Sequence, residues 1–203
     1  MIKAIILAAG ASVRMGRPKA ALPLGERGET VLSVGVRTLV AAGLRDVTVV
    51  AGAHVEAVRS AIATSGERVR IVEHRGWEQG QLSSLLAGLD AVSNPELDAV
   101  LVTLVDVPLV RPDTVRAVVA AWSTTRAPIV RPVNGDRHGH PVIFDASVFD
   151  DLRAADPGVG AKAVFAIHRA RILDVPVDDP GAFIDVDTPE DYERMVRKGS
   201  DGF

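Results

Sequence analysis

The sequence predicts an α/β fold in three layers, with helices on both faces of a Rossmann-like, mostly parallel sheet. Apolar runs of strand length alternate with segments whose apolar residues recur at helical spacing. The run at 98–105 is almost wholly apolar, which suits a central strand buried on both faces. With 203 residues, 47% of them hydrophobic, the chain can form one such core. We therefore expect a single domain spanning residues 1–203.

Each element is expected from its own local pattern. An opening strand over 4–9 precedes a helix over 30–43, where Thr30 suits an N-cap and Gly43 a stop. Pro112 suits the first turn of a later helix. The remaining strands are expected at 46–51, 69–72, 98–105, 129–132, 141–144 and 172–177. The remaining helices are expected at 55–63, 81–92, 112–122, 145–154, 160–168 and 189–197, with residues 199–203 expected to be disordered.

Composition excludes several classes of function. A net charge of −3 and a pI near 5.9 argue against a broad nucleic-acid or anionic-membrane interface, so any anion site is local. No apolar run reaches the ~20 residues of a membrane span, and the apolar opening is shorter than the core of a signal peptide. Without cysteine there is no disulfide, thiolate metal site or cysteine nucleophile. We expect a cytoplasmic protein with no membrane or nucleic-acid partner.

The loop that follows the opening strand has the chemistry of a polyphosphate site. Gly10 and Gly16 allow backbone N–H groups to turn toward an anion, and Arg14, Arg17 and Lys19 bring three cations within six positions. A solvated strand-to-helix turn is the simpler alternative for any one glycine-rich loop. The spacing fits neither a Walker A loop nor the dinucleotide-binding fingerprint.

Carboxylates follow two of the expected strands. Asp106 stands at the end of the central strand, at the sheet edge where α/β proteins bind ligands, and we expect it to ligate Mg²⁺ rather than only initiate a turn. Asp185 and Asp187 are spaced to share one face of an extended segment, where a cation would relieve their repulsion. Thr188 and Asp191 are explained by helix capping alone. This pattern leaves Asp185 and Asp187 both open as the second metal ligand.

The opening loop resembles the signature of the nucleotidyltransferases, Leu-Ala-Ala-Gly-x-Ser/Gly-x-Arg-Met-Gly-x-x-Lys. Its fixed positions are met by Leu7, Ala8, Ala9, Gly10, Ser12, Arg14, Met15, Gly16 and Lys19. The resemblance implies a GT-A-like nucleotidyltransferase fold in which these residues bind the nucleotide. A second element, Gly-x-x-Ser-Ser-Leu, is placed by such enzymes against the base and ribose, and here it implies contacts from Gly80, Gln81, Ser83 and Ser84. The ending of sugar nucleotidyltransferases, aligned on this chain, places a metal-binding aspartate at Asp185 and a glycine at Asp187. This resemblance ranks Asp185 ahead of Asp187 as the second metal ligand.

The second half of the chain is similar to the molybdenum-cofactor cytidylyltransferases, of the MobA-like and MocA-type family. The similarity is carried by Gly139-His140-Pro141, by Val177 to Gly181 and by the run from Asp185 to Asp191. It implies that Gly139, His140 and Pro141 contact the acceptor substrate. Two features depart from the family pattern: the turn at 25–29 is longer, and the stretch at 156–162 has two extra residues and ends in Lys162 instead of arginine.

The resemblance implies transfer of a nucleotidyl group from an NTP to the phosphate of a molybdopterin-type cofactor, with release of pyrophosphate and delivery to a recipient molybdoenzyme. Arg14, Lys19 and Asp106 would be catalytic, and the metal would be Mg²⁺ or Mn²⁺. CTP is favoured because guanylyltransferases carry Ala-Gly-Gly at the positions of Ala8 to Gly10. Transfer of GMP, transfer to another small phosphate, and a cofactor-binding chaperone without catalysis remain the alternatives.

Overall fold

A computed structural model describes residues 1–25 and 28–200, with side chains described through Arg197. Residues 26 and 27, which belong to the turn expected at 25–29, lie outside the described range. Residues 201–203 at the end of the tail lie outside it as well. The strands are β1 Ile2–Ala8, β2 Val47–Ala51, β3 Val69–Glu73, β4 Ala99–Leu104, β5 Ile129–Asn134, β6 Arg137–His138, β7 Val142–Asp145 and β8 Ile172–Pro176. The α-helices are α1 Val31–Ala41, α2 Val55–Ala63, α3 Gln81–Val92, α4 Pro112–Thr125, α5 Phe149–Ala154, α6 Lys162–Ile167 and α7 Pro189–Ser200.

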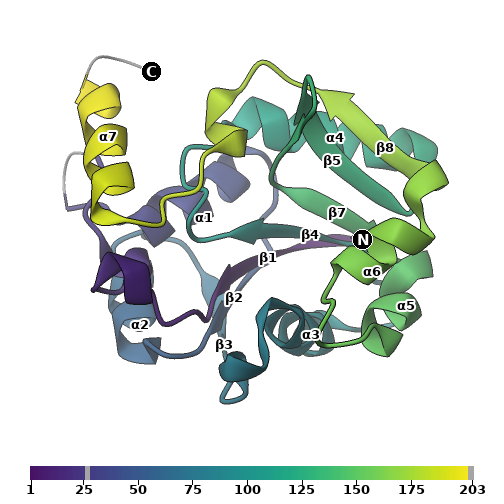
Figure 1. Ribbon diagram of the computed structural model, residues 1–203, viewed down its shortest axis with the longest axis horizontal. Helices are drawn as coiled ribbons and strands as arrows, with labels where there is room; N and C mark the ends of the chain where they lie inside the picture. Colours follow the sequence, from purple (N-terminus) through teal and green to yellow (C-terminus); the bar gives the residue numbers. More distant parts are fainter. Residues whose placement is uncertain (26–27, 201–203) are drawn as a thin grey trace.

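Within this described part, the strands form one mixed, mostly parallel sheet of eight strands in the order β3-β2-β1-β4-β7-β5-β6, with β8 on β5 (Figure 1). Strands β1 to β4 are parallel, and β4 is central, as the sequence predicts. Strand β7 runs antiparallel to both β4 and β5. This reversal follows from the short polar connection between β5 and β7, which is too short for the crossover that parallel strands need.

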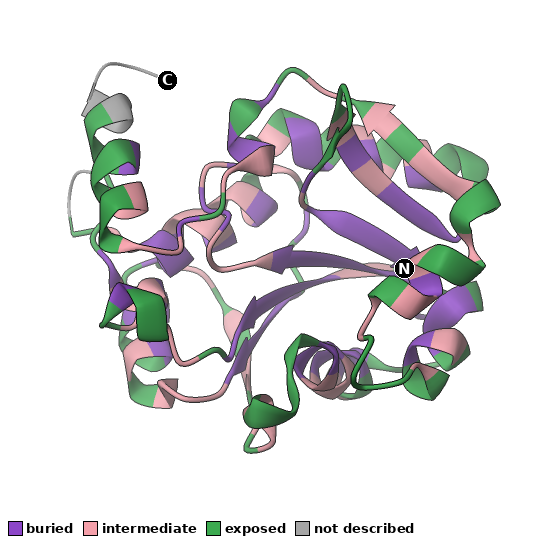
Figure 2. Ribbon diagram, viewed as in Figure 1, coloured by how far each residue is buried: buried purple, intermediate pink, exposed green. Residues whose placement is uncertain are grey.

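Alternation along β1 divides the core between the two faces of the sheet. Ala4, Ile6 and Ala8 point into a cluster completed by α1, α2 and α4. Ile5 and Leu7 point into a second cluster completed by α3, α5 and α6. Because side chains alternate along a strand and both sets are buried, helices must cover both faces. The expected three-layer α/β/α fold is confirmed, and Figure 2 shows buried residues along the central strands.

Helix α7 lies apart from the two helical layers that cover the sheet, beside the loop that follows β1 (Figure 1). It begins with the capping box expected from the sequence: Thr188 N–H donates to Asp191, and Asp191 N–H donates to the Thr188 hydroxyl. Met195 then packs with Met15 and Val186 in a third buried cluster. The helix continues to Ser200, and residues 201–203 of the expected tail lie outside the described residues.

Two expected helices are shorter in the structure. The range 145–154 divides because Asp145 ends β7 and its carboxylate accepts from Ser147 N–H, leaving a 3-10 turn before α5. The range 160–168 begins late because Gly160, at φ 71°, lies outside helical geometry. Among the described residues, no helix combines the length and hydropathy needed to cross a membrane.

Buried Asp179 ties the segment before α7 to the start of α4. Its carboxylate accepts from Arg111 N–H at 2.8 Å, Thr114 Oγ1 at 2.6 Å and Gly181 N–H at 3.1 Å. Asp179→Ala would leave these three donors without an acceptor, so we expect it to lower the free energy of unfolding by roughly 2–4 kcal/mol. Urea denaturation measures the loss.

The control for Asp179 is its exposed neighbour, Asp178→Ala, which is expected to stay within about 0.5 kcal/mol of the wild type. Equal stability of the two variants would show that the buried carboxylate contributes nothing to the connection.

Candidate functional site

The loop after β1 is held in a compact form by its own residues. Ser12 (φ 53°) and Gly16 (φ 71°) both adopt left-handed geometry, and between them the chain makes one 3-10 turn. Lys19 N–H donates to Ser12 Oγ at 3.2 Å, which closes the loop. Beneath it, the Met15 side chain is buried against Leu22. The loop therefore has a packed inner side and a cationic outer side.

The ammonium group of Lys19 joins two carboxylates from distant parts of the chain. Its Nζ lies 3.1 Å from Asp106 Oδ2 and 2.5 Å from Asp187 Oδ1. Arg14 adds a second cation, 2.9 Å from Asp187 Oδ2. The two acidic segments also meet through the backbone, because Val186 N–H donates to the Asp106 carbonyl at 2.8 Å. The structure thus brings together the opening loop, the end of β4 and the segment before α7.

The two aspartates of this last segment have different electrostatic surroundings. Burial raises the pKa of the Asp185 carboxyl, and the nearby charge of Asp106 raises it further. The hydrogen bond from Lys19 lowers the pKa of Asp187, and the charge of Arg14 adds to that effect. Of the two, Asp187 is therefore the carboxylate neutralised by cations, whereas Asp185 is exposed and lies near the charge of other acids.

The donors around Asp106 suit a divalent cation that prefers oxygen ligands. Asp106 Oδ1 is buried without a hydrogen-bond partner, and carboxylate oxygens are the ligands Mg²⁺ and Mn²⁺ favour. In the part of the chain that the structure describes, however, no three acidic, histidine or cysteine side chains converge closely enough to hold a metal. The carboxylates are of the right chemical type for such an ion, but Lys19 forms salt bridges with two of them, Asp106 and Asp187.

A cavity of about 420 Å³ opens beside this ionic cluster at the carboxyl ends of β1 and β4. Most residues that the sequence assigned to nucleotide binding line it. Met15, Gly16 and Ser83 do not: Met15 faces the core, Gly16 closes the turn, and Ser83 Oγ donates to the Gly80 carbonyl at 2.8 Å. The predicted residues in its lining are Leu7, Ala8, Ala9, Gly10, Ser12, Arg14, Lys19, Gly80, Gln81, Ser84, Asp106 and Asp187.

His54 and Trp77 are among the lining residues that the sequence did not predict. His54 follows β2, and its Nε2 lies 2.9 Å from the Ala11 carbonyl, so its ring supports the loop. Trp77 forms a side wall opposite Gly52, where an added Cβ would lie 2.5 Å from the Ala9 carbonyl and 2.7 Å from the Trp77 ring. The signal available for His54 was its place after a parallel strand, at the ligand-binding edge of the sheet.

A second cavity, of about 400 Å³, adjoins the first, since Leu7, Gln81 and Leu104 line both. Its lining includes Gly139 and His140 of the expected acceptor motif. Pro141 lies outside it, because the chain turns toward β7 there. Apolar side chains form much of the wall, cationic side chains come from Arg131 and Lys162, and His138 adds an imidazole.

His140 borders the second cavity as a largely buried imidazole. Burial lowers its pKa, although the charges of Asp185 and Asp106 oppose that effect, so the ring is neutral near pH 7. Its Nδ1 atom is buried and has no hydrogen-bond partner. Gly139 packs so tightly that an added Cβ would lie 2.3 Å from the Ala182 carbonyl, which gives this glycine a structural reason as well.

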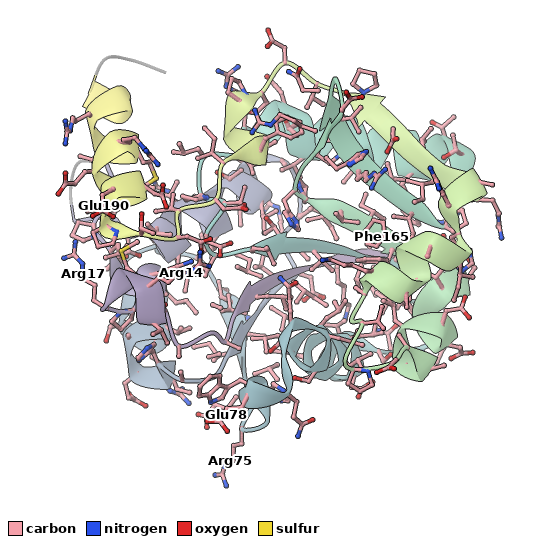
Figure 3. All side chains as sticks on the ribbon, in the orientation of Figure 1. Arg14, Arg17, Arg75, Glu78, Phe165 and Glu190 are labelled. Carbon is pink, nitrogen blue, oxygen red and sulfur yellow. The ribbon has the colours of Figure 1, made fainter. Side chains whose placement is uncertain are left out.

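The two arginines of the opening loop point in different directions (Figure 3). Arg14 points toward the segment that leads into α7, whereas Arg17 lies at the outer side of α7, near Glu190. Arg17 stacks over the Tyr192 ring at 5.3 Å. Arg14 and Lys19 thus belong to the ionic cluster, and Arg17 does not.

Comparison with known proteins supports one family over most of the chain. A family model described as a MobA-like NTP transferase domain matches residues 4–172. Nicotine blue oxidoreductase of Paenarthrobacter nicotinovorans is 33% identical over 207 residues, with 96% of each chain covered. Purine catabolism protein PucB of Bacillus subtilis (strain 168) is 29% identical, with 96% of this chain and 95% of PucB covered.

The fold is also shared with a solved structure at a comparable level of identity. Rv0371c of Mycobacterium tuberculosis H37Rv superposes with a TM-score of 0.81 at 30% identity, covering 97% of this chain and 98% of that one. A structure of the same protein complexed with manganese superposes with a TM-score of 0.75. Because the family model spans most of its length, this chain belongs to the MobA-like NTP transferase domain family.

Proposed function

We propose that this protein transfers a nucleotidyl group from an NTP, with CTP favoured, to the phosphate of a molybdopterin-type cofactor and releases pyrophosphate. One observation carries the proposal: a cavity with paired cations and carboxylates adjoins a second cavity of similar volume. The nucleotide would occupy the first and the acceptor the second. The reacting groups would meet where the two cavities adjoin, beside the residues that line both, Leu7, Gln81 and Leu104.

The chemistry asks little of the protein beyond position and charge. A phosphate monoester is mostly dianionic at pH 7 and attacks without a general base. The chain must hold that phosphate in line with the leaving group and neutralise the charge on pyrophosphate. Lys19, Arg14 and the N–H groups of the opening loop supply positive charge on the leaving-group side. Asp106 and Asp185 would hold Mg²⁺ or Mn²⁺, which supplies neutralisation of the phosphate oxygens.

The preference for CTP draws its support from the start of the loop. Ala9 packs in the same buried cluster as Leu82, so its methyl group forms part of the cavity floor. The guanylyltransferases carry glycine at this position, which would leave that floor deeper. The manganese complex of Rv0371c supports a divalent cation in the reaction, with Mg²⁺ as the second ion to test.

Pyrophosphate release tests the reaction directly. Each of the four NTPs is incubated with the protein and Mg²⁺ or Mn²⁺, with and without a molybdopterin-type cofactor. We expect release from CTP that depends on both the cofactor and the cation. Release from GTP alone would instead assign guanylyl transfer, and release only when another small phosphate replaces the cofactor would assign a different acceptor. No release with any NTP would contradict nucleotidyl transfer and favour a cofactor-binding chaperone.

A second candidate is favoured by one observation: the relative at 33% identity is named an oxidoreductase. In that reading the first cavity would hold a nucleotide-containing redox cofactor that is not cleaved. Oxidation of NADH or NADPH by the protein, without pyrophosphate release from any NTP, would favour this candidate over the transferase.

A further inference from the structure

The ammonium group of Lys19 occupies the space between Asp106 and Asp187, at 3.1 and 2.5 Å. Only 11% of its side chain is exposed, so this contact is sheltered from solvent. Sheltered charge pairs are screened less by salt than surface pairs are. Lys19 is thus held firmly in the resting protein, at the position where the carboxylates would accept a cation.

Asp106 is the first expected metal ligand, and Asp187 is the alternative to Asp185 as the second. Asp106 has one oxygen on Lys19 and one buried oxygen without a partner, and Asp187 has both oxygens on cations. A divalent ion that enters this cluster must displace the lysine or lie against its charge. Free metal is therefore disfavoured while Lys19 stays in place.

We propose that Lys19 is a placeholder for the metal, which selects the metal–triphosphate complex over the free divalent ion. A triphosphate in the first cavity would draw Lys19 and Arg14 away from Asp187, releasing carboxylates for the ion that arrives with it. This inference rests on the proposed function, since it assigns a triphosphate to that cavity. It also makes metal and nucleotide affinities reciprocal, as linkage requires.

The position of Lys19 in the chain suits such an exchange. It opens the short 3-10 turn Lys19–Ala21, and its backbone is anchored to Ser12. The side chain can therefore change partners without rearranging the loop. Arg14, with 68% of its side chain exposed, can move still more easily.

Binding of Mn²⁺ without nucleotide, measured by the loss of the free-ion EPR signal, tests the proposal without turnover. Lys19→Met keeps the length of the side chain and removes its charge. We expect Mn²⁺ to bind this variant about tenfold or more tightly than the wild type, because a larger fraction of the protein has free carboxylates. Lys19→Arg keeps a competing charge and should bind as weakly as the wild type.

Charge removal elsewhere in the loop separates displacement from general electrostatics. Arg17→Met removes a cation that stacks on Tyr192, outside the cluster, and should leave Mn²⁺ affinity unchanged. If Lys19→Met binds Mn²⁺ no more tightly than Arg17→Met, the placeholder role is overturned. Circular dichroism of each variant confirms that a folded protein is being compared.

Nucleotide binding without metal gives the reciprocal measurement. With EDTA present, CTP is titrated into the wild type and into Asp187→Asn, which frees Arg14 and Lys19 from a carboxylate. We expect several-fold tighter CTP binding by the variant, whereas equal or weaker binding would overturn the exchange. These equilibrium results are independent of pyrophosphate release. Absent release would contradict the reaction alone, and unchanged affinities would contradict the placeholder alone.

Discussion

Replacing Asp106 by asparagine is expected to lower the rate of pyrophosphate release by roughly 10³-fold, because it removes a carboxylate charge from the centre of the site. Asp106 is the meeting point of three segments: its side chain contacts Lys19, its carbonyl accepts from Val186, and its second oxygen is buried and unpaired. The backbone contact survives the substitution, so the fold should persist. Steady-state kinetics with CTP and the molybdopterin-type cofactor measure the loss.

A matched control for Asp106 is available outside the linings of both cavities. Asp136 lies exposed in the turn between β5 and β6, and Asp136→Asn changes the same net charge. It should retain near-wild-type turnover. If Asp106→Asn also retains it while both proteins unfold at the wild-type temperature, the carboxylate has no part in the reaction.

Strands β1 and β4 show why the sheet could be predicted from the sequence. Residues 4–8 of β1 and 99–102 of β4 are uninterrupted apolar stretches, and only a strand covered on both faces buries every side chain of such a stretch. Because β1 and β4 are parallel neighbours, their carboxyl ends lie at the same edge of the sheet. This places Asp106 close to the loop after β1. The short helices were harder, because Asp145 and Gly160 act through local turn geometry that periodicity does not reveal.

The sequence predicted which residues form the site better than it predicted the contacts between them. The bridge from Lys19 to Asp187 joins residues 168 positions apart, and nothing local announces such a pairing. Alternation placed Asp185 and Asp187 on one face, yet the structure gives them opposite pKa shifts, since only Asp187 faces the loop cations. Met15 fits the nucleotide-binding signature but serves the core, which shows that a signature mixes contact residues with supporting ones.

Replacing Lys19 by methionine is expected to lower turnover by roughly 10²–10³-fold, the usual cost of removing one charged group that stabilises a transition state. The loss should fall mainly on kcat, because the ammonium matters most when pyrophosphate departs. Arg17→Met is the matched control: it removes the same charge from the same loop, but outside the ionic cluster, and should retain turnover. Steady-state pyrophosphate release separates the two variants.

The value of this variant lies in the sign of its two effects. A variant that merely disturbed the loop would weaken both turnover and Mn²⁺ binding. If Lys19 serves the leaving group during the reaction and holds the metal position before it, Lys19→Met must lower turnover while it raises the affinity for free Mn²⁺. Opposite changes in one protein are hard to obtain from misfolding, whereas a parallel loss of both would remove Lys19 from the mechanism and reduce it to a support of the loop.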